Sequence, residues 1–457
     1  SCLKSLPSYD PRITRFAVDI PWADPIPWEL GRPYLYTAKI KLSHRSSTST
    51  SNFDSLSTST SNFDLRFGFR EIWREGRELY MNGHKLHFRP AYSFGANEWG
   101  ARMLRDVGYN VLTVNHNTDA VGCSVSTNLW DWLDRNGMGI VLNPGAFPAV
   151  DGGTWNTHAA FATNTVSQQR YRDFIRAWHR KHRNHPSLFA AYVTQMIICD
   201  IGNFHPAVLA QQTTPRSGKH KAIEVAADIN REYNPNILYY SHADGSCADL
   251  SSGNLYLNWT PLEERENWLS QWSEKGTWPW HSAEFGQPYG GSWYNCDGEA
   301  GFTKYSAIYF GDWAYESEPM FALTNSVAAR TTNKSRHGSP LGTAIAKTHP
   351  GYWALQRLWT RNTNRAWRGY GHGGGNIYFN LNLAYGEVPK AKAWDKGLGY
   401  GRMTESNYLH RAEWTNPAYE IYQQSNQDFC GFIGGWPVHT DKTHAYYSGE
   451  TIKKQYV

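Results

Sequence analysis

From residue 85 onward, short runs of β-forming residues alternate with longer amphipathic segments, and this alternation constrains the fold more than any other feature. Such a pattern predicts βα units that build a parallel sheet, an α/β fold. The candidate strands are Leu86–Pro90, Val111–Asn115, Gly139–Asn143, Leu188–Thr194, Leu238–Ser241, Asn254–Trp259, Trp280–Glu284 and Asn376–Leu381. Eight strands in this order predict a closed (β/α)8 TIM barrel, whose functional residues lie at the carboxyl ends of the strands.

The amphipathic segments between these strands carry apolar residues three and four positions apart, and several end in Gly or Asn-Pro, as helices do. They are EWGARMLRDVG, TNLWDWLDRNG, QQRYRDFIRAWHRKH, HKAIEVAADINREY, PLEERENWLSQWSEKG, FTKYSAIYFGDWAYE and GYWALQRLWTRNTNRAW. We therefore expect a helix after nearly every strand.

The regions on either side of residues 79–390 differ from this pattern. Residues 12–42 alternate apolar and polar positions, which is typical of strands. Ser47–Asp54 is repeated as Ser57–Asp64, a polar low-complexity stretch from which we predict a surface loop over residues 43–64. Residues 391–457 return to short runs and turn residues, and we expect them to lead into a further β domain.

Composition excludes several classes of function. The net charge of +5 is small for 457 residues, and Lys and Arg are dispersed, so nucleic acid is not an expected partner. No apolar run is long enough to span a bilayer, so we expect no membrane contact. With 21 Trp and 28 Tyr, the chain has aromatic rings in excess, and stacking on sugar rings is one use for them. A Trp-rich core accounts for another part of the excess.

Cofactor and compartment signals are sparse. Six cysteines lack CxxC spacing, which argues against a zinc site, and we predict neither a metal nor a cofactor. The first residues do not form a signal peptide. We nevertheless expect a secreted or periplasmic location. Neither disulfide pairing nor oligomeric state follows from the sequence.

Several segments resemble glycoside hydrolase family two, the group of β-galactosidases, β-glucuronidases and β-mannosidases. FGFREIWREGRELYMNGHKLHFRPAYS resembles the junction between the family's immunoglobulin-like domain and its barrel, and PWELGRPYLYTAKIKL resembles the end of its sandwich domain. MLRDVGYNVLTVNH, LWDWLDRNGMGIVLNPG and HRNHPSLFAAYV are similar to its second, third and fourth strand regions. The resemblance implies that residues 1–78 are the end of a β-sandwich domain, that residues 79–390 are the catalytic barrel, and that the substrate is a carbohydrate.

HSAEFGQP, residues 281–288, resembles the strand that carries the family's nucleophile. A retaining glycosidase needs two carboxyl groups about 5 Å apart, one as nucleophile and one as acid/base. Glu284, at the end of a predicted strand, is therefore our candidate nucleophile. The alternative is a structural Glu that pairs with an Arg or caps the following helix.

The acid/base has no obvious counterpart. In the family the fourth strand ends in an Asn-Glu pair, and the corresponding positions here are Gln195 and Met196. Gln195 can keep a polar contact to the sugar, but Met196 cannot donate a proton. Asp200 is the nearest carboxylate, and acid catalysis and capping of a turn are equally compatible with its position. Glu98, His116 and His242 are further candidates.

Residues expected to line the substrate pocket follow from their position at or just beyond the predicted strand ends. They are Asn115, His116, Asn143, Gln195, His242, Tyr256, Asn258, Trp259 and Trp293. Amide and imidazole groups suit sugar hydroxyls, and indole rings stack on sugars. Because Tyr256 and Asn258 share one face of a regular strand, this pair is a better candidate than Trp259.

HRKHRNH places three histidines at three-residue spacing, which suggests a metal site or, more simply, the solvated basic face of a helix. We favour the solvated face. The resemblance therefore implies an exo-acting, β-galactosidase-like retaining glycosidase with Glu284 as nucleophile. The alternative is a catalytically impaired barrel that binds carbohydrate, because the expected acid is missing.

Overall fold

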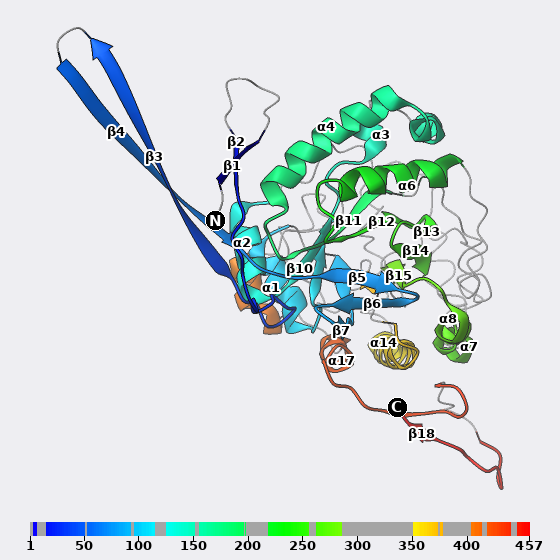
Figure 1. Ribbon diagram of the computed structural model, residues 1–457. Helices are drawn as coiled ribbons and strands as arrows, with labels where there is room; N and C mark the ends of the chain where they lie inside the picture. The colour runs from blue at the N-terminus through cyan, green and yellow to red at the C-terminus, as the bar shows by residue number, and fades with distance from the viewer. Residues whose placement is uncertain are drawn as a thin grey trace, which may run out of the picture.

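The computed structural model in Figure 1 places most of the predicted strands and helices in one α/β body. It describes residues 3–6, 15–50, 53–92, 96–114, 125–150, 155–195, 197, 218–255, 262–285, 351–372, 375–377, 404–413, 418–439 and 446–457. The helix expected over residues 302–316 lies outside these ranges. Among the described residues, no helix is long and apolar enough to cross a bilayer.

Within the described residues, the main sheet has nine strands, of which eight run parallel and follow one another in chain order around the sheet. The eight parallel strands are β8 (Pro90–Tyr92), β9 (Val111–Thr113), β10 (Gly139–Leu142), β11 (Leu188–Gln195), β12 (Leu238–His242), β14 (Leu250–Leu255), β15 (Trp280–Phe285) and β16 (Gly375–Ile377). Strand β13 (Gly245–Cys247) runs antiparallel to β14. The first parallel strand, β8, pairs with the last, β16, so the order is that of a sheet that curls round on itself.

Asp249 joins β12 to the start of β14, the one neighbouring pair of parallel strands without a ladder in the part of the chain that the structure describes. Its backbone N–H donates to the carbonyl of Tyr239 at 2.8 Å, and its carboxylate Oδ2 accepts from the N–H of Tyr239 at 2.7 Å. The N–H of Ala243 also donates to Ser252 Oγ at 3.0 Å. These three hydrogen bonds connect β12 and β14 in place of a regular ladder.

Helices lie between successive strands, and local capping explains where three of them begin. Asn97, Ser126 and Asn164 cap α1 (Glu98–Asp106), α2 (Thr127–Asn136) and α4 (Thr165–His182) by accepting hydrogen bonds from backbone N–H groups of the first turn. Helix α2 ends at Gly137, whose φ of +63° suits the left-handed C-cap position. The described helices are α1 (Glu98–Asp106), α2 (Thr127–Asn136), α3 (Phe147–Val150), α4 (Thr165–His182), α6 (Gly218–Arg231), α7 (Leu262–Glu266), α8 (Ser270–Lys275), α14 (Gly351–Gly369), α16 (Glu405–Leu409) and α17 (Ala418–Ser425), with 3₁₀ segments η1 (Trp155–Ala162) and η3 (Arg411–Glu413).

The parallel strands separate two apolar clusters. One face, here called the inner face, carries Val111, Val141, Tyr192 and Tyr240, which pack with Phe88. The opposite, helix face packs against the helices and carries alternate residues of the same strands, including Leu112, Ile140, Leu142, Val193 and Tyr239. Both faces are buried, as expected for a parallel sheet covered on both sides.

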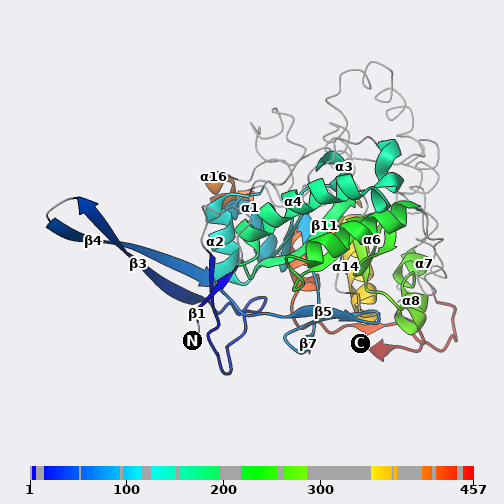
Figure 2. The same cartoon turned by 45° about the horizontal axis from the view of Figure 1, so that its top comes forward.

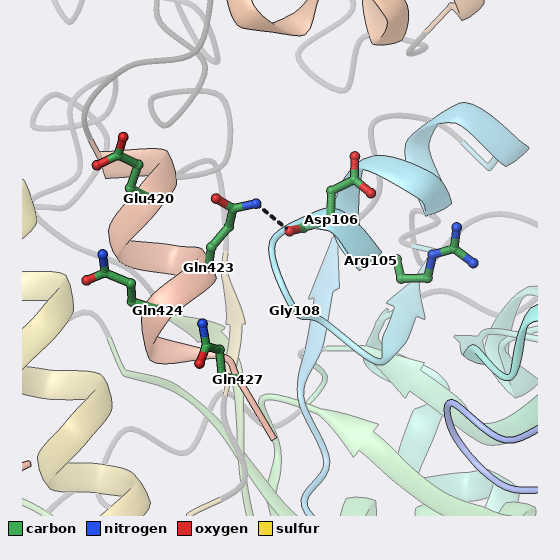
Figure 3. A pocket seen from close by; sticks show the side chains of 7 residues that line it. All are labelled: Arg105, Asp106, Gly108, Glu420, Gln423, Gln424 and Gln427. Carbon is green, nitrogen blue, oxygen red and sulfur yellow. Dashed lines mark hydrogen bonds between the residues drawn. The ribbon is translucent and has the colours of Figure 1, made fainter. Parts of the chain in front are cut away.

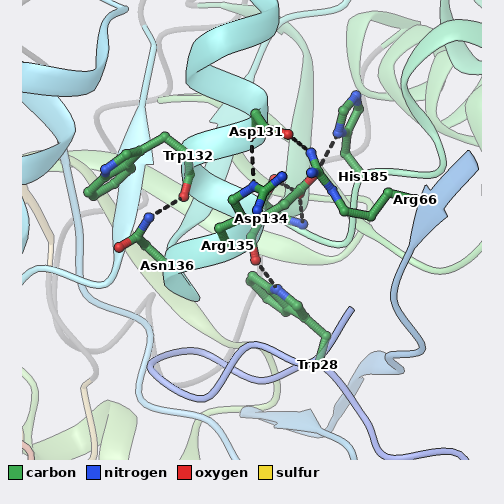
Figure 4. Close-up of polar contacts among 9 residues, drawn as sticks. Trp28, Arg66, Asp131, Trp132, Asp134, Arg135, Asn136 and His185 are labelled. Carbon is green, nitrogen blue, oxygen red and sulfur yellow. Dashed lines mark hydrogen bonds and ion pairs between the residues drawn. The ribbon is translucent and has the colours of Figure 1, made fainter. Parts of the chain in front are cut away.

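A second group of strands connects the amino-terminal region to the main sheet. Strands β5 (Ile72–Glu75), β6 (Glu78–Met81) and β7 (His84–Lys85) form an antiparallel sheet whose Ile72, Leu79 and Met81 join the inner-face cluster. Trp28 packs in the same cluster, and its Nε1 donates to the carbonyl of Asp134 at 2.8 Å, a hydrogen bond drawn in Figure 4. The carboxylate of Asp134 in turn binds His185 Nδ1 at 2.7 Å and Ser187 Oγ at 2.6 Å. These hydrogen bonds connect the segment around Trp28 to α2 and to the start of β11.

The predicted surface loop over residues 43–64 is wrong: residues 43–50 and 53–64 belong to a long hairpin of β3 (Tyr36–Thr50) and β4 (Phe53–Phe67). Figure 2 shows the hairpin projecting from the body, and a separate short pair, β1 (Leu3–Leu6) and β2 (Arg15–Val18), lies at the amino-terminal end. In the register of the hairpin, Ser47–Thr50 of the first repeat pairs with Phe53–Leu56, and Ser57–Asp64 of the second repeat pairs with Lys39–Ser46. Polarity indicated a loop, whereas Thr and the flanking aromatic residues favour extended backbone.

The solvated histidine face predicted for α4 is also wrong. His179 and His182 are buried, at 0% and 8% exposure, because they continue the stripe of Tyr171 and Ile175 along the side of the helix that faces the sheet. His179 Nε2 lies 3.0 Å from Asn230 Oδ1, and the ring of His182 lies 5.3 Å from that of Trp130. No group of three or more His, Cys, Asp or Glu within the described ranges is placed to hold a metal.

The burial of these two histidines predicts acid sensitivity. Burial lowers the pKa of His179 and of His182 from 6.5 to about 4. Because the unfolded chain binds these protons near pH 6.5, the folded state loses stability as the pH falls from about 6.5 toward about 4. We expect urea unfolding to show a loss on the order of a few kcal/mol between about pH 7.5 and about pH 4.5. His182→Gln should reduce that pH dependence, whereas His410→Gln, at an exposed position, should leave it unchanged.

Several element boundaries differ from those predicted. Strand β8 begins at Pro90 rather than Leu86, β14 begins at Leu250 rather than Asn254, and the helix expected over residues 261–276 is two short helices. Helix α17 packs against α14 and so extends the body past the predicted boundary at residue 390. The carboxamide of Gln423 on α17 donates to the carbonyl of Asp106 at 2.9 Å. Farther on, β17 (Ile433–Gly434) pairs with β18 (Gln455–Tyr456).

Candidate active site

The carboxyl ends of the parallel strands collect several of the predicted site residues. Asn143 follows β10, and His242 ends β12; both are 1% exposed. The backbones of Gln195 and Glu284 lie at the ends of β11 and β15. Asn115, His116, Asp200, Tyr256, Asn258, Trp259 and Trp293 lie outside the described residues.

The register of β15 changes just before Glu284. His281 pairs with Ser252, but Glu284 pairs with Asn254, so β15 has one residue more than β14 between these pairs. The same irregularity separates the β15 pairs with β16. An extra residue of this kind is a β-bulge, and bulges are frequent beside active sites.

This bulge decides which face position 284 occupies. His281 lies on the inner face, where its ring is 5.1 Å from Phe88 and 5.2 Å from Tyr240, whereas Trp280 belongs to the helix face. Strict alternation from Trp280 would assign position 284 to the helix face. Because the register instead pairs position 284 with position 254, which has the parity of Ser252 and His281, the backbone assigns it to the inner face.

Strand β11 has a second irregularity at its carboxyl end. Tyr192 pairs with Tyr240, and Gln195 pairs with His242, so three steps along β11 match two along β12. His242 lies on the inner face with its ring 6.1 Å from that of Tyr192. The backbone register therefore gives Gln195 the same inner-face parity as His242, and both candidate strands bring a predicted site position to that face.

Asn143 has a donor to spare at this end of the sheet. Its Oδ1 accepts the N–H of Gly145 at 2.8 Å, which fixes the side chain in a turn after β10. Its Nδ2 is buried and has no hydrogen-bond partner among the residues that the structure describes. An unpaired buried donor is costly, so this amide is well suited to a bound hydroxyl or water.

A row of aromatic rings lies beneath these strand ends. Tyr192 spans from β11 to β9, where its hydroxyl donates to the carbonyl of Val114 at 2.9 Å, and its ring is 5.9 Å from that of Tyr240. Burial raises the pKa of Tyr240 well above 10, and burial with the nearby His242 lowers the pKa of His281 well below 6.5. Both groups are therefore neutral near pH 7. Tyr192, Tyr240 and His281 thus form a surface that we call the uncharged floor. No pattern in the sequence indicated this floor, because its members lie inside the strands rather than at their ends.

Glu98, considered above as an acid, belongs to the first turn of α1. Its Oε1 lies 2.6 Å from Arg102 Nη2, and both side chains are about one-third exposed. A carboxylate placed at a helix start and paired four residues on has an ordinary structural role. The structure thus gives no reason to place Glu98 in the chemistry.

Two cavities lie at the opposite, amino-terminal ends of the strands. The first, of about 400 Å³, lies between the end of α1 and helix α17, as Figure 3 shows. Its lining residues are Arg105, Asp106, Gly108, Glu420, Gln423, Gln424 and Gln427. The second, of about 390 Å³, includes Pro186 and Asn236, which precede β11 and β12. Neither lies where a sheet of this topology places its chemistry.

Comparisons with known proteins give a fold but not a family. No protein-family model matches the chain, and no curated protein matches it. Among solved structures, a GH2 β-galacturonidase from Eisenbergiella tayi with bound glycerol matches with a TM-score of 0.51 at 15% identity, over 95% of this chain and 63% of the other. The galacturonate-bound form of that enzyme gives 0.49 at 15% identity, over 91% and 61%. A β-glucuronidase from Ruminococcus gnavus gives 0.48 at 12% identity, over 88% and 57%.

The likeness to the glycerol-bound β-galacturonidase shows a shared fold. The chain spans less than two thirds of the length of these structures. The resemblance seen in the sequence blocks and the likeness of the fold therefore agree, although they rest on different observations.

Proposed function

We propose that the chain is a retaining β-glycosidase with Glu284 as its nucleophile. The observation that carries the proposal is the bulge in β15, which gives position 284 the inner-face parity at the carboxyl end of a parallel strand. The fold shared with a β-galacturonidase supports it. The proposal includes closure of the eight parallel strands into a (β/α)8 barrel, with the contacts of Asp249 at the β12–β14 junction, and the assignment of residues 1–78 to a β-sandwich domain.

The proposed reaction proceeds in two steps. The Glu284 carboxylate attacks the anomeric carbon, the bond to the leaving oxygen breaks, and an acid gives that oxygen a proton. Water then attacks the anomeric carbon of the glycosyl-enzyme, a base takes its proton, and the Glu284 carboxylate is released. In this proposal the reacting carbon lies above the uncharged floor of Tyr192, Tyr240 and His281. The low polarity of the floor strengthens charge interactions with the developing oxocarbenium ion.

Asp200 remains the proposed acid/base. Met196 takes the position that holds the acid in the resembled family, so the proton must come from elsewhere. Among the described carboxylates, Glu98 is paired on α1, and Asp244 accepts hydrogen bonds on the helix face next to Ser241. His116 and His242 are the alternatives in the proposal.

The proposed substrate is the non-reducing end of a β-linked oligo- or polysaccharide, with a β-galactoside-like sugar. The structural likeness to a β-galacturonidase makes galacturonides and glucuronides the first competitors. The pocket in this proposal consists of Asn115, His116, Asn143, Gln195, His242, Tyr256, Asn258, Trp259 and Trp293. A panel of aryl β-glycosides that includes both neutral sugars and uronic acids tests the substrate class directly. A secreted or periplasmic location remains part of the proposal.

Asn143 provides a test of the pocket. Asn143→Ala removes the spare Nδ2 donor and should raise KM about tenfold, with a smaller change in kcat, because the donor binds substrate and transition state alike. Steady-state kinetics on the best aryl glycoside measures the effect. Asn62→Ala, at an exposed position of the hairpin, serves as the control and should behave as wild type. An unchanged KM for Asn143→Ala would remove this residue from the pocket.

A carbohydrate-binding protein without catalysis is the second candidate, and the Met at position 196 favours it. An aryl glycoside with a good leaving group separates the two. A nucleophile on its own still becomes glycosylated by such a substrate and releases a burst of the aryl group. Oligosaccharide binding without any burst would support the binding protein and contradict the glycosidase.

A further inference from the structure

The residue that follows position 196 is held from both sides by charged side chains. The backbone N–H of Ile197 donates to Asp244 Oδ2 at 3.3 Å, and its carbonyl accepts from Lys219 Nζ at 2.7 Å. Asp244 lies in the turn after β12, and Lys219 lies in the first turn of α6. The Ile197 side chain is itself 3% exposed. Side chains from two separate elements therefore form hydrogen bonds with the backbone where the chain leaves β11.

The Asp244 side chain is fixed in place by its surroundings. Its side chain is 0% exposed, and its carboxylate also accepts a hydrogen bond from the hydroxyl of Ser241. Ala243, just before it, has a φ of +60°, a conformation that non-glycine residues rarely adopt. The N–H of Ala243 is held by Ser252 Oγ at 3.0 Å. Unusual backbone of this kind persists only where the surroundings fix it.

The position of Ser241 shows what the Asp244 carboxylate does. Tyr240 and His242 lie on the inner face, so Ser241 between them belongs to the helix face. Its hydroxyl reaches the Asp244 carboxylate on that side of the strand. The carboxylate is thus placed to hold backbone from behind the strands rather than to touch a ligand on the inner face.

We propose that Asp244 and Lys219 are positioning residues that fix the exit of β11 and, with it, Gln195; this inference rests on the proposed glycosidase function. Gln195 pairs with His242, and Asp244 is two residues beyond His242. The Asp244 carboxylate therefore fixes the end of β11 relative to the end of β12. We call the contacts of Asp244 and Lys219 with Ile197 the clamp. Displacing a substrate-contacting group by about 1 Å can lower the rate about a hundredfold, so loss of the clamp should lower kcat.

The test combines amide hydrogen exchange with kinetics on Asp244→Ala, Asp244→Asn and Lys219→Met. Asp244→Ala should speed exchange of the Ile197 amide at least about tenfold, because its acceptor is gone. In the same variant kcat should fall about ten- to a hundredfold with KM within about threefold. Asp244→Asn keeps the shape of the side chain, so its kcat and its exchange rate at Ile197 should lie between those of the wild type and Asp244→Ala. Lys219→Met removes only the contact to the carbonyl and should lower kcat more mildly.

Asp228→Asn is the matched control, since Asp228 is 71% exposed and pairs only with Arg231 on its own helix among the contacts described for it. It should match wild type in both measurements. Unchanged exchange at Ile197 in Asp244→Ala would overturn the clamp, and so would exchange that rises equally in every strand. Faster exchange with an unchanged kcat in an active enzyme would overturn the positioning role. If wild type turns over no glycoside, the proposed function fails, and the exchange result alone decides whether Asp244 holds β11.

Discussion

Glu284→Gln is expected to lower kcat by at least about a thousandfold on any substrate of the wild-type enzyme, because the amide cannot act as the nucleophile. The substitution keeps the size of the side chain, so the fold should persist. The bulge in β15 gives this position its inner-face parity, and no other described strand end offers a Glu or Asp at such a position. Steady-state kinetics on an aryl β-glycoside measures the loss.

The control for this variant is Glu264→Gln on α7, an exposed carboxylate outside the proposed site. It should retain wild-type kinetics. Sodium azide should partly restore turnover of an activated substrate by Glu284→Ala, because the shortened side chain leaves room for a small anion to attack the anomeric carbon in place of the carboxylate. A Glu284→Gln enzyme that keeps wild-type kcat would remove Glu284 from the mechanism.

Trp28→Ala is expected to destabilise the protein by about 3–5 kcal/mol, the cost of removing a large buried aromatic side chain. Trp28 is 0% exposed, and it packs with Ile72, Leu79 and Met81. Its Nε1 also donates to the carbonyl of Asp134, as Figure 4 shows, so the substitution leaves that buried carbonyl with one partner fewer. Urea unfolding followed by circular dichroism measures the loss.

Trp22→Ala is the matched control, because Trp22 is 48% exposed and contacts Tyr36 and Phe69 at the base of the hairpin. Its removal should cost about 1 kcal/mol or less. Equal destabilisation by the two substitutions would mean that Trp28 does not anchor the amino-terminal segment to the main sheet.

The regular elements could be predicted because their signals are local. Asn97 and Ser126 before apolar-periodic segments indicate helix starts, and Gly137 indicates a helix end. The order of eight strands followed from the same alternation. The β3–β4 hairpin was missed because its polar stretch indicated a loop, and the pairing of Ser57–Asp64 with Lys39–Ser46 is not visible in polarity alone.

The histidines of α4 show a different limit. Lys and Arg beside His179 and His182 suggested a solvated face, yet the apolar stripe of Tyr171 and Ile175 points to the buried side. Helical periodicity, had it been given more weight than local charge, would have placed both histidines correctly. In the structure His179 Nε2 lies within hydrogen-bond distance of Asn230, and the ring of His182 stacks on Trp130; both neighbours are distant in the sequence.

The candidate site was predictable at the level of strand ends but not of faces. Sequence alternation from Trp280 assigns Glu284 to the helix face, and only the pairing of β15 with β14 and β16 reveals the extra residue. The Asp244 clamp was equally hidden, because a turn carboxylate in SHADG has no sequence signal for a partner at Ile197. Long-range register and contacts are what the sequence alone lacks.

The most direct measurement of the central claim is intact-mass spectrometry after incubation with a panel of 2-deoxy-2-fluoro β-glycosides, including neutral sugars and uronic acids. We expect a covalent adduct on the wild-type protein with one member of the panel, located by peptide mapping on Glu284 and absent from Glu284→Gln. An adduct on another residue, or none with any sugar while oligosaccharide binding is measurable, would mean that Glu284 is not the nucleophile.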